Sequence, residues 1–129
     1  MQVICTISCK LEYSQLQAQH LDATLKAFAD ACNFVADYSC ANSEIKQFSL
    51  HKACYADIRV KFGLPANLAV RAIARVAVTF KEKKKRNSIF EPTSADFDSR
   101  IFSLNTDLMV ASLTLLHKRE KFRLKIGDY

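Results

Sequence analysis

The residues best suited to chemistry in this sequence are basic side chains gathered in two clusters. Residues 66–86 hold seven lysines and arginines against one acidic residue, and residues 117–125 hold five against one. Residues 1–64 balance at six basic and six acidic residues, so the net charge of +6 arises in the second half of the chain. Backbone phosphates require cationic side chains and little further geometry. The asymmetry therefore favours a polyanionic partner over a role in solubility.

The densest part of the first cluster is the run KEKKKR at residues 81–86. It ends a helical pattern, so some of its lysines complement the negative end of a helix dipole. That role accounts for one or two lysines and not for five positive charges. A solvated helix end and one wall of a groove for nucleic acid are both open interpretations.

Signals for catalysis or metal binding are weak. The histidines His20, His51 and His117 are not spaced with cysteines or carboxylates as metal ligands usually are. Asp96 and Asp98 form a DxD pattern that suits the cap of a turn better than a divalent cation. With two glycines the chain has no phosphate-binding loop. We therefore expect no enzyme, no cofactor, no metal and no small-molecule substrate.

Composition predicts an ordered chain of 129 residues, sized for one domain with or without an inserted subdomain. Five cysteines without a CxxC pair argue against a disulfide framework and a zinc ribbon, and favour buried thiols in a reducing compartment. The N-terminus lacks the apolar core and cleavage site of a signal peptide, and no run approaches the roughly 18 apolar residues of a membrane span. We expect a soluble, cytoplasmic protein with no membrane partner.

The first elements are a strand and a long helix. Residues 3–11 alternate apolar and polar side chains, which is the period of a half-buried strand. Ser14 and Gln17 then fit a capping box at a helix start. The apolar stripe of the helix, about 24 residues long, consists of Leu21, Leu25, Phe28, Cys32 and Val35.

Two further helices follow. Ser49 is the expected N-cap of the second, whose stacked apolar residues are Leu50, Cys54, Ile58 and Phe62. Gly63 suits the left-handed position that closes a helix, and Pro65 suits the start of the third. The apolar stripe of the third helix is Ala69, Ile73, Val76 and Phe80. Arg71 and Arg75 lie one turn apart on another face.

After residue 87 the period returns to two, which predicts about four strands. The candidate strands are SIFEP, DFDSRIFSL, DLMVASLTLL and KFRLKI, with a polar break over residues 117–120 before the last. In that last strand Lys121, Arg123 and Lys125 point away from the apolar residues. A sheet would thus present a cationic row on its open face. Phe80, Phe90, Phe97 and Phe102 would stack on exposed bases if they faced solvent, although such residues are more often core.

These elements predict an α+β fold. A lone first strand needs partners, so we expect it to pair with the C-terminal strands in a small antiparallel β-barrel or curved sheet of the wedge or OB-like kind. A three-helix bundle would then be inserted after the first strand. The predicted parts are residues 1–12 with 88–129, and residues 13–87. A groove between the two basic clusters could hold a nucleic-acid backbone.

The order of these segments resembles the N-terminal region of the transposon-encoded OrfB/TnpB proteins and their relatives among type V CRISPR effectors. The resemblance covers nearly all of the chain and is carried by QFSLHKACYADIRVKFGLPANLAVRAIARVAVTFKEKKK, FDSRIFSL and KREKFRLKI. Its most specific parts are the residue spacing from Leu50 to Val76 and the triplet of Asp98, Ser99 and Arg100. It implies a wedge-like barrel with an inserted helical recognition bundle, from a class of RNA-guided DNA nucleases.

The resemblance has clear limits. The nuclease half of such proteins, with its catalytic acidic residues and zinc ribbon, would follow Tyr129 and is not in this sequence, so we expect no DNA cleavage. Lys118 stands where relatives often have a glycine. The resemblance implies that the third helix lies along guide RNA or its duplex with DNA, read by shape and backbone.

The predicted function is thus a noncatalytic nucleic-acid-binding module for structured RNA or an RNA–DNA duplex. The alternative is a homodimeric interaction module that covers an open sheet edge and has no role with nucleic acid. The expected nucleic-acid-binding residues are Arg71, Arg75, Lys81, Lys83, Lys84, Lys85, Arg86, Arg100, Lys121, Arg123 and Lys125.

Overall fold

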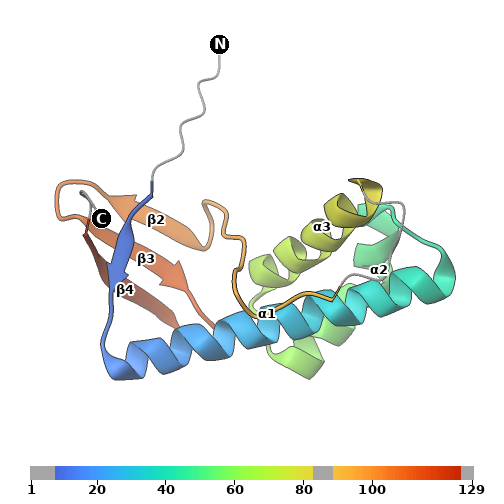
Figure 1. The fold of residues 1–129 in the computed structure, drawn as a ribbon, viewed down its shortest axis with the longest axis horizontal. Coiled ribbons are helices and arrows are strands. Elements are labelled where there is room, and N and C mark those ends of the chain that lie inside the picture. The colour runs from blue at the N-terminus through green and yellow to red at the C-terminus, as the bar shows by residue number, and fades with distance from the viewer. Residues whose placement is uncertain (1–7, 83–88, 126–129) are drawn as a thin grey trace, which may run out of the picture.

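The chain forms three helices and one open antiparallel sheet of four strands (Figure 1). The computed structural model describes residues 8–82 and 89–125. The elements follow in the order β1 (Lys10–Glu12), α1 (Gln15–Asn42), α2 (Gln47–Phe62), α3 (Ala66–Glu82), β2 (Phe102–Asn105), β3 (Val110–Thr114) and β4 (Arg119–Lys125). The predicted α+β class is confirmed at this level.

Helix α1 begins where the sequence predicts. Ser14 caps it, since its hydroxyl accepts from the Gln17 backbone N–H and the Gln17 side chain accepts from the Ser14 N–H, both at 3.1 Å. The helix runs for 28 residues, about 42 Å, and ends at Ser43 in the left-handed conformation. In Figure 1 it passes along the sheet at its N-terminal end and along α2 and α3 further on.

Helix α2 begins earlier than predicted. Its N-cap is Lys46, not Ser49, and no side chain caps it. The carboxylate of Glu44 accepts the Lys46 backbone N–H at 2.8 Å, which sets the chain direction three residues before the expected cap. Ser49 therefore lies within the first turn. The predicted core positions Leu50, Cys54 and Ile58 are fully buried.

Gly63 closes α2 as predicted. Its φ is +66° and its N–H donates to the Arg59 carbonyl at 3.1 Å. Pro65 precedes the first residue of α3, and its carbonyl accepts from the Ala69 N–H. The predicted stripe of α3 is confirmed as buried: Ala69, Ile73, Val76 and Phe80.

Replacement of Gly63 by alanine is expected to lower the free energy of unfolding by about 1 kcal/mol. A Cβ at Gly63 meets nothing within 4 Å, so the cost arises from the left-handed backbone and not from a clash. Ser43 has the opposite situation, because a non-glycine residue already occupies φ 51° there. Ser43→Gly is the control and is expected to raise stability in the same urea titration. Equal effects of the two variants would contradict this explanation.

The sheet has the order β1-β4-β3-β2, and every neighbouring pair is antiparallel. Pairing of the first strand with a C-terminal strand is confirmed, as Leu11 lies opposite Leu124. The strand covers only Lys10–Glu12, and residues 3–7 of the predicted strand lie outside the described residues. A closed barrel is wrong, because β1 and β2 lie at opposite edges and do not pair in the described part of the chain. The residues Ile89 to Pro92 form no strand, and Asp96 to Arg100 form a loop and turn before β2.

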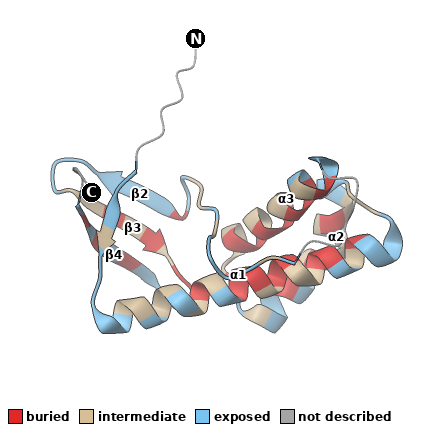
Figure 2. Cartoon of the chain, in the orientation of Figure 1, coloured by how far each residue is buried: buried red, intermediate tan, exposed pale blue. Residues whose placement is uncertain are grey.

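Buried residues form two cores, one among the helices and one on the sheet (Figure 2). Helix α1 contributes to the first core and packs against the second through the partly buried Leu21. The larger core lies among the three helices, with alanines on α1 and α3 that let the helices approach closely. The smaller core is formed by Leu113, Leu115 and Phe122, packed against Leu11 and Leu21. Phe97 packs against both cores. The predicted division into two parts stays a prediction, although the helices do fall between β1 and β2 in the chain.

Candidate nucleic-acid interface

The open face of the sheet gathers basic side chains on β4. Arg119, Lys121, Arg123 and Lys125 are exposed, and the residues between them are buried. Alternate residues of a strand face opposite sides, so the four basic side chains share one face at intervals of about 6.8 Å. The cationic row predicted from Lys121, Arg123 and Lys125 is therefore present, and Arg119 extends it by one position.

The neighbouring strands add to this face through their register. Residues directly opposite each other in antiparallel strands lie on the same side of the sheet. Lys10 lies opposite Lys125, and Glu12 opposite Arg123. The partners on β3 and β2 that share the face are Val110, Ser112, Thr114, Ser103 and Asn105. We call these eleven residues the open face; it holds five basic side chains, one acidic side chain and three hydroxyls.

Arg119 lies across three strands of the open face. Its Nε donates to the Ser112 hydroxyl at 2.7 Å, and its Nη2 donates to the Ser103 hydroxyl at 3.1 Å. Its Nη1 donates to the Thr114 hydroxyl and the Arg100 carbonyl. These four bonds hold the guanidinium plane in place before any ligand arrives, which lowers the entropy lost on binding.

Helix α1 occupies the other face of the sheet. The Gln17 side-chain amide donates to the Lys121 carbonyl at 3.0 Å, and Leu21 packs against the smaller core. An apolar groove of about 350 Å³ remains between β1, α1 and Phe97. Helix α1 thus covers this side of the sheet, whereas the basic side chains on β4 are exposed.

The arginines of α3 are engaged by acidic residues of the segment that precedes β2. Arg75 donates to both carboxylate oxygens of Asp96, at 2.9 and 2.7 Å, and to Ser94. Its guanidinium also lies 4.8 Å from the centre of the Phe28 ring. Hydrogen bonding to Asp96 raises the pKa of Arg75. These bonds fasten the 94–96 segment to α3, and a role of Arg75 in binding stays a prediction.

Arg71 faces the next acidic residue of the same segment. Its Nε is buried, lies 3.9 Å from Asp98 Oδ2 and has no hydrogen-bond acceptor among the described residues. Asp98 Oδ1 accepts the Arg100 backbone N–H at 3.0 Å, as expected for the cap of a turn. The DxD pattern thus forms ion pairs with α3. The Arg100 side chain is exposed beside the start of β2.

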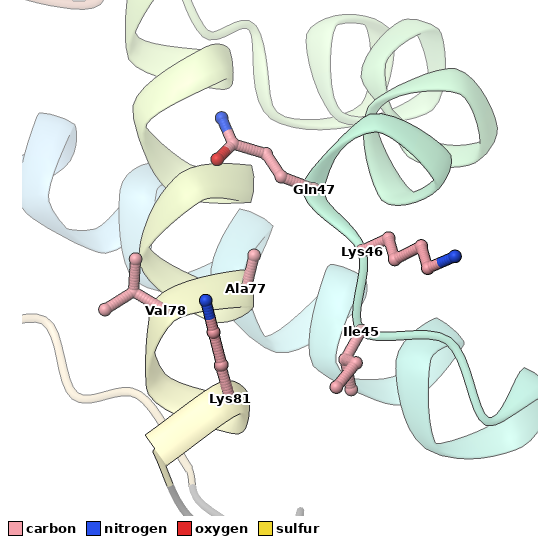
Figure 3. A pocket seen from close by; sticks show the side chains of 6 residues that line it. All are labelled: Ile45, Lys46, Gln47, Ala77, Val78 and Lys81. Atoms are coloured by element: carbon pink, nitrogen blue, oxygen red, sulfur yellow. The ribbon is translucent and has the colours of Figure 1, made fainter.

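Lys81 lies at the far end of α3, beside a groove of about 420 Å³ (Figure 3). Figure 3 shows Lys81 lying along α3 and Lys46 directed away from the groove. The lining is mostly apolar, with Ile45, Ala77 and Val78. Lys83, Lys84, Lys85 and Arg86 lie outside the described residues, so the predicted groove between the two basic clusters stays a prediction.

The cysteines offer no nucleophile in the cores. Burial raises the pKa of Cys32 to about 12 and that of Cys54 to about 11, which keeps both thiols protonated. Cys9 and Cys40 are exposed, so the expectation of buried thiols holds for only two of these four residues. Within residues 8–82 and 89–125 no group of three or more His, Cys, Asp or Glu side chains could hold a metal ion.

The aromatic residues considered for base stacking are mostly part of the cores. Phe80 is buried, while Phe90 and Phe97 pack against the larger core. Phe102 is 37% exposed, but its partner Leu113 places it on the side opposite the open face. The open face itself carries no aromatic residue on the described strands. Its chemistry suits a phosphate backbone and not stacked bases.

The structure also brings together residues that the sequence keeps apart. His20 on α1 lies 2.7 Å from the buried carboxylate of Glu120 on β4. The ring of His117 lies edge-on to His20, with centroids 6.2 Å apart. No local pattern predicts this cluster, because His20 is about a hundred residues from His117 and Glu120 in the chain. Arg119 was missed because residues 117–120 were interpreted as a break, although its alternation with Lys121 could have indicated its side.

Comparisons of the chain with models of protein families, with curated proteins and with solved structures found no match. The resemblance to the N-terminal region of OrfB/TnpB proteins therefore stays a prediction. In the part of the chain that the structure describes, no helix has both the length and the apolar character needed to cross a membrane.

Proposed function

We propose that the protein is a nucleic-acid-binding module that recognises the backbone and shape of structured RNA or an RNA–DNA duplex. The observation that carries the proposal is the open face, with five basic side chains and one acidic side chain on a sheet whose other side α1 covers. A flat row of cations with hydroxyl neighbours matches what sequence-independent phosphate contact requires.

The spacing of the open face supports this proposal. Basic residues recur on β4 at about 6.8 Å, which is the scale of the distance between successive phosphates of one strand. The hydroxyls of Ser103, Ser112 and Thr114 lie among them and can donate to phosphate oxygens. Arg119 is already held in place by four bonds. The surface is thus organised before binding.

The salt dependence of binding tests the proposal. With up to five phosphate contacts, the affinity for duplex RNA is expected to fall about 10²- to 10³-fold between about 50 and about 200 mM salt. Fluorescence anisotropy with labelled duplex RNA, RNA–DNA duplex and duplex DNA measures it. An affinity that stays constant over this range would overturn the proposal, as would the absence of binding to all three.

A second function is favoured by one observation at the edge of the sheet. In the described part of the chain β2 is an edge strand, and Phe102 and Leu104 on it are 37% and 48% exposed. Addition of β2 from a second copy would pair the edge and cover both side chains. Light scattering detects such a dimer. A dimer that binds none of the nucleic acids would favour this second function over the first.

A further inference from the structure

A cluster of two histidines and one carboxylate lies where α1 meets the start of β4. The Nδ1 of His20 lies 2.7 Å from Glu120 Oε2, and the side chains are 23% and 8% exposed. The His117 ring lies at 72° to that of His20, and His117 is exposed on the loop before β4. The imidazole rings of His20 and His117 are thus neighbours, and the buried Glu120 carboxylate holds the ring of His20.

Backbone contacts hold the cluster together. The Thr24 hydroxyl donates to the His20 carbonyl at 2.8 Å and accepts the Leu116 N–H at 3.1 Å. The loop that carries His117 is therefore tied to the turn of α1 that carries His20. Gln17, one turn earlier, donates to the Lys121 carbonyl. These hydrogen bonds between α1 and the segment of residues 116–121 therefore fix the position of the His20 ring relative to the His117 ring.

The cluster lies close to the open face. Lys121 follows Glu120 directly and points to the opposite side of the sheet. In the described part of the chain β1 pairs only with Arg123 to Lys125, and Gln17 of α1 donates to the Lys121 carbonyl further along that edge. The approach from the open face to the cluster therefore lies at the start of β4, where His117 and Lys118 are exposed.

We propose that His20 and His117 cleave RNA without a metal ion, by transfer of a phosphoryl group to the adjacent ribose 2′-hydroxyl. The proposal rests on the proposed function for the binding of the substrate. Its substrate class is RNA with a single-stranded segment, because in-line attack by the 2′-oxygen needs a phosphodiester that is not held in a helix. DNA lacks the attacking hydroxyl and is not a substrate.

The two histidines have complementary roles. With Nδ1–H donated to Glu120, the neutral His20 ring presents Nε2 as a base. Nε2 takes the proton of the 2′-hydroxyl, the 2′-oxygen bonds to phosphorus, and the bond from phosphorus to the 5′-oxygen breaks. Protonated His117 gives its proton to that 5′-oxygen. The products are a 2′,3′-cyclic phosphate and a 5′-hydroxyl, and exchange of one proton each with water restores both rings.

Glu120 is a positioning residue in this scheme. It fixes the tautomer and orientation of His20 and stabilises the imidazolium that forms during attack, as a carboxylate does in catalytic triads. Lys118, exposed next to His117 in the chain, supplies positive charge near the phosphate. Every group the reaction needs thus belongs to this chain, to the RNA or to water.

The test is cleavage of a labelled single-stranded RNA by the full chain in the presence of EDTA, with the DNA of the same sequence beside it. We expect RNA fragments that end in a cyclic phosphate and intact DNA. His117→Ala is the main variant, since His117 is exposed and its removal leaves the pair of His20 and Glu120 intact. Its cleavage rate is expected to fall at least about 100-fold with the affinity for RNA unchanged.

The control is His51→Ala, which removes a histidine stacked on Tyr55 of α2, far along the chain from the cluster. It is expected to cleave as the unchanged protein does. Glu120→Gln is expected to lower kcat and to leave KM unchanged, which a merely structural role would not do. RNA that is bound but not cut overturns this proposal and leaves the proposed function standing. Cleavage that persists in His117→Ala, or that extends to DNA, also overturns it.

Discussion

The protein with Lys121→Glu and Arg123→Gln is expected to bind duplex RNA about a hundred-fold more weakly than the unchanged chain at low salt. Both residues lie in the middle of the exposed row on β4. The change removes two phosphate contacts and adds one repulsive carboxylate. Glutamine is chosen at Arg123 because Glu12 lies opposite and a second carboxylate there would destabilise the sheet. Anisotropy titrations measure the affinity, and the salt dependence should become shallower in parallel.

The matched control is Lys46→Glu with Lys52→Gln, which changes the net charge by the same amount. Both of these lysines are exposed, at the start of α2 and on its first turns, away from the sheet. If the open face binds the RNA, the control variant is expected to have nearly the same RNA affinity as the unchanged protein. Equal losses in the two double variants would mean that net charge alone attracts the RNA, and the open face would lose its assigned role.

The Phe28→Ala variant is expected to lose about 3–5 kcal/mol of unfolding free energy. Phe28 is fully buried in the larger core at the middle of α1, and the Arg75 guanidinium lies 4.8 Å from its ring centre. Removal of the ring leaves a cavity among the three helices and removes the contact between the ring and the Arg75 guanidinium. Since small domains are stable by about 5–15 kcal/mol, the loss is a large part of the total. Urea unfolding followed by circular dichroism measures it.

Phe48→Ala provides the comparison for this variant. The chemical change is the same, but Phe48 is 81% exposed on α2. Its stability is expected to stay within about 0.5 kcal/mol of the unchanged protein. A loss at Phe28 no greater than the loss at Phe48 would show that the helical core does not depend on this ring.

Local elements of the fold could be predicted because their signals are local. The capping box of Ser14 and Gln17, the left-handed Gly63 and the buried stripe of α3 each depend on residues within a few positions of one another. The start of α2 was predicted three residues late, since the Glu44 carboxylate and not a serine sets its entry. The closed barrel was predicted wrongly. Alternation of apolar and polar residues indicates how many strands there are, but not whether the two edge strands of the sheet pair with each other.

The candidate site divides in the same way. Alternation along one strand determines that Lys121, Arg123 and Lys125 share a side, because a strand repeats every two residues. The face of the sheet that α1 covers is decided by long-range packing. The ion pair between Arg75 and Asp96 is decided in the same way. The same holds for His20, His117 and Glu120, which lie in segments about a hundred residues apart in the chain. The sequence by itself determined the three helices and the side on which the basic residues of the last strand lie, since both follow from local periodicity. Only the tertiary structure decided which charges remain open to a partner and which residues meet, because contacts distant in the chain leave no periodic signal.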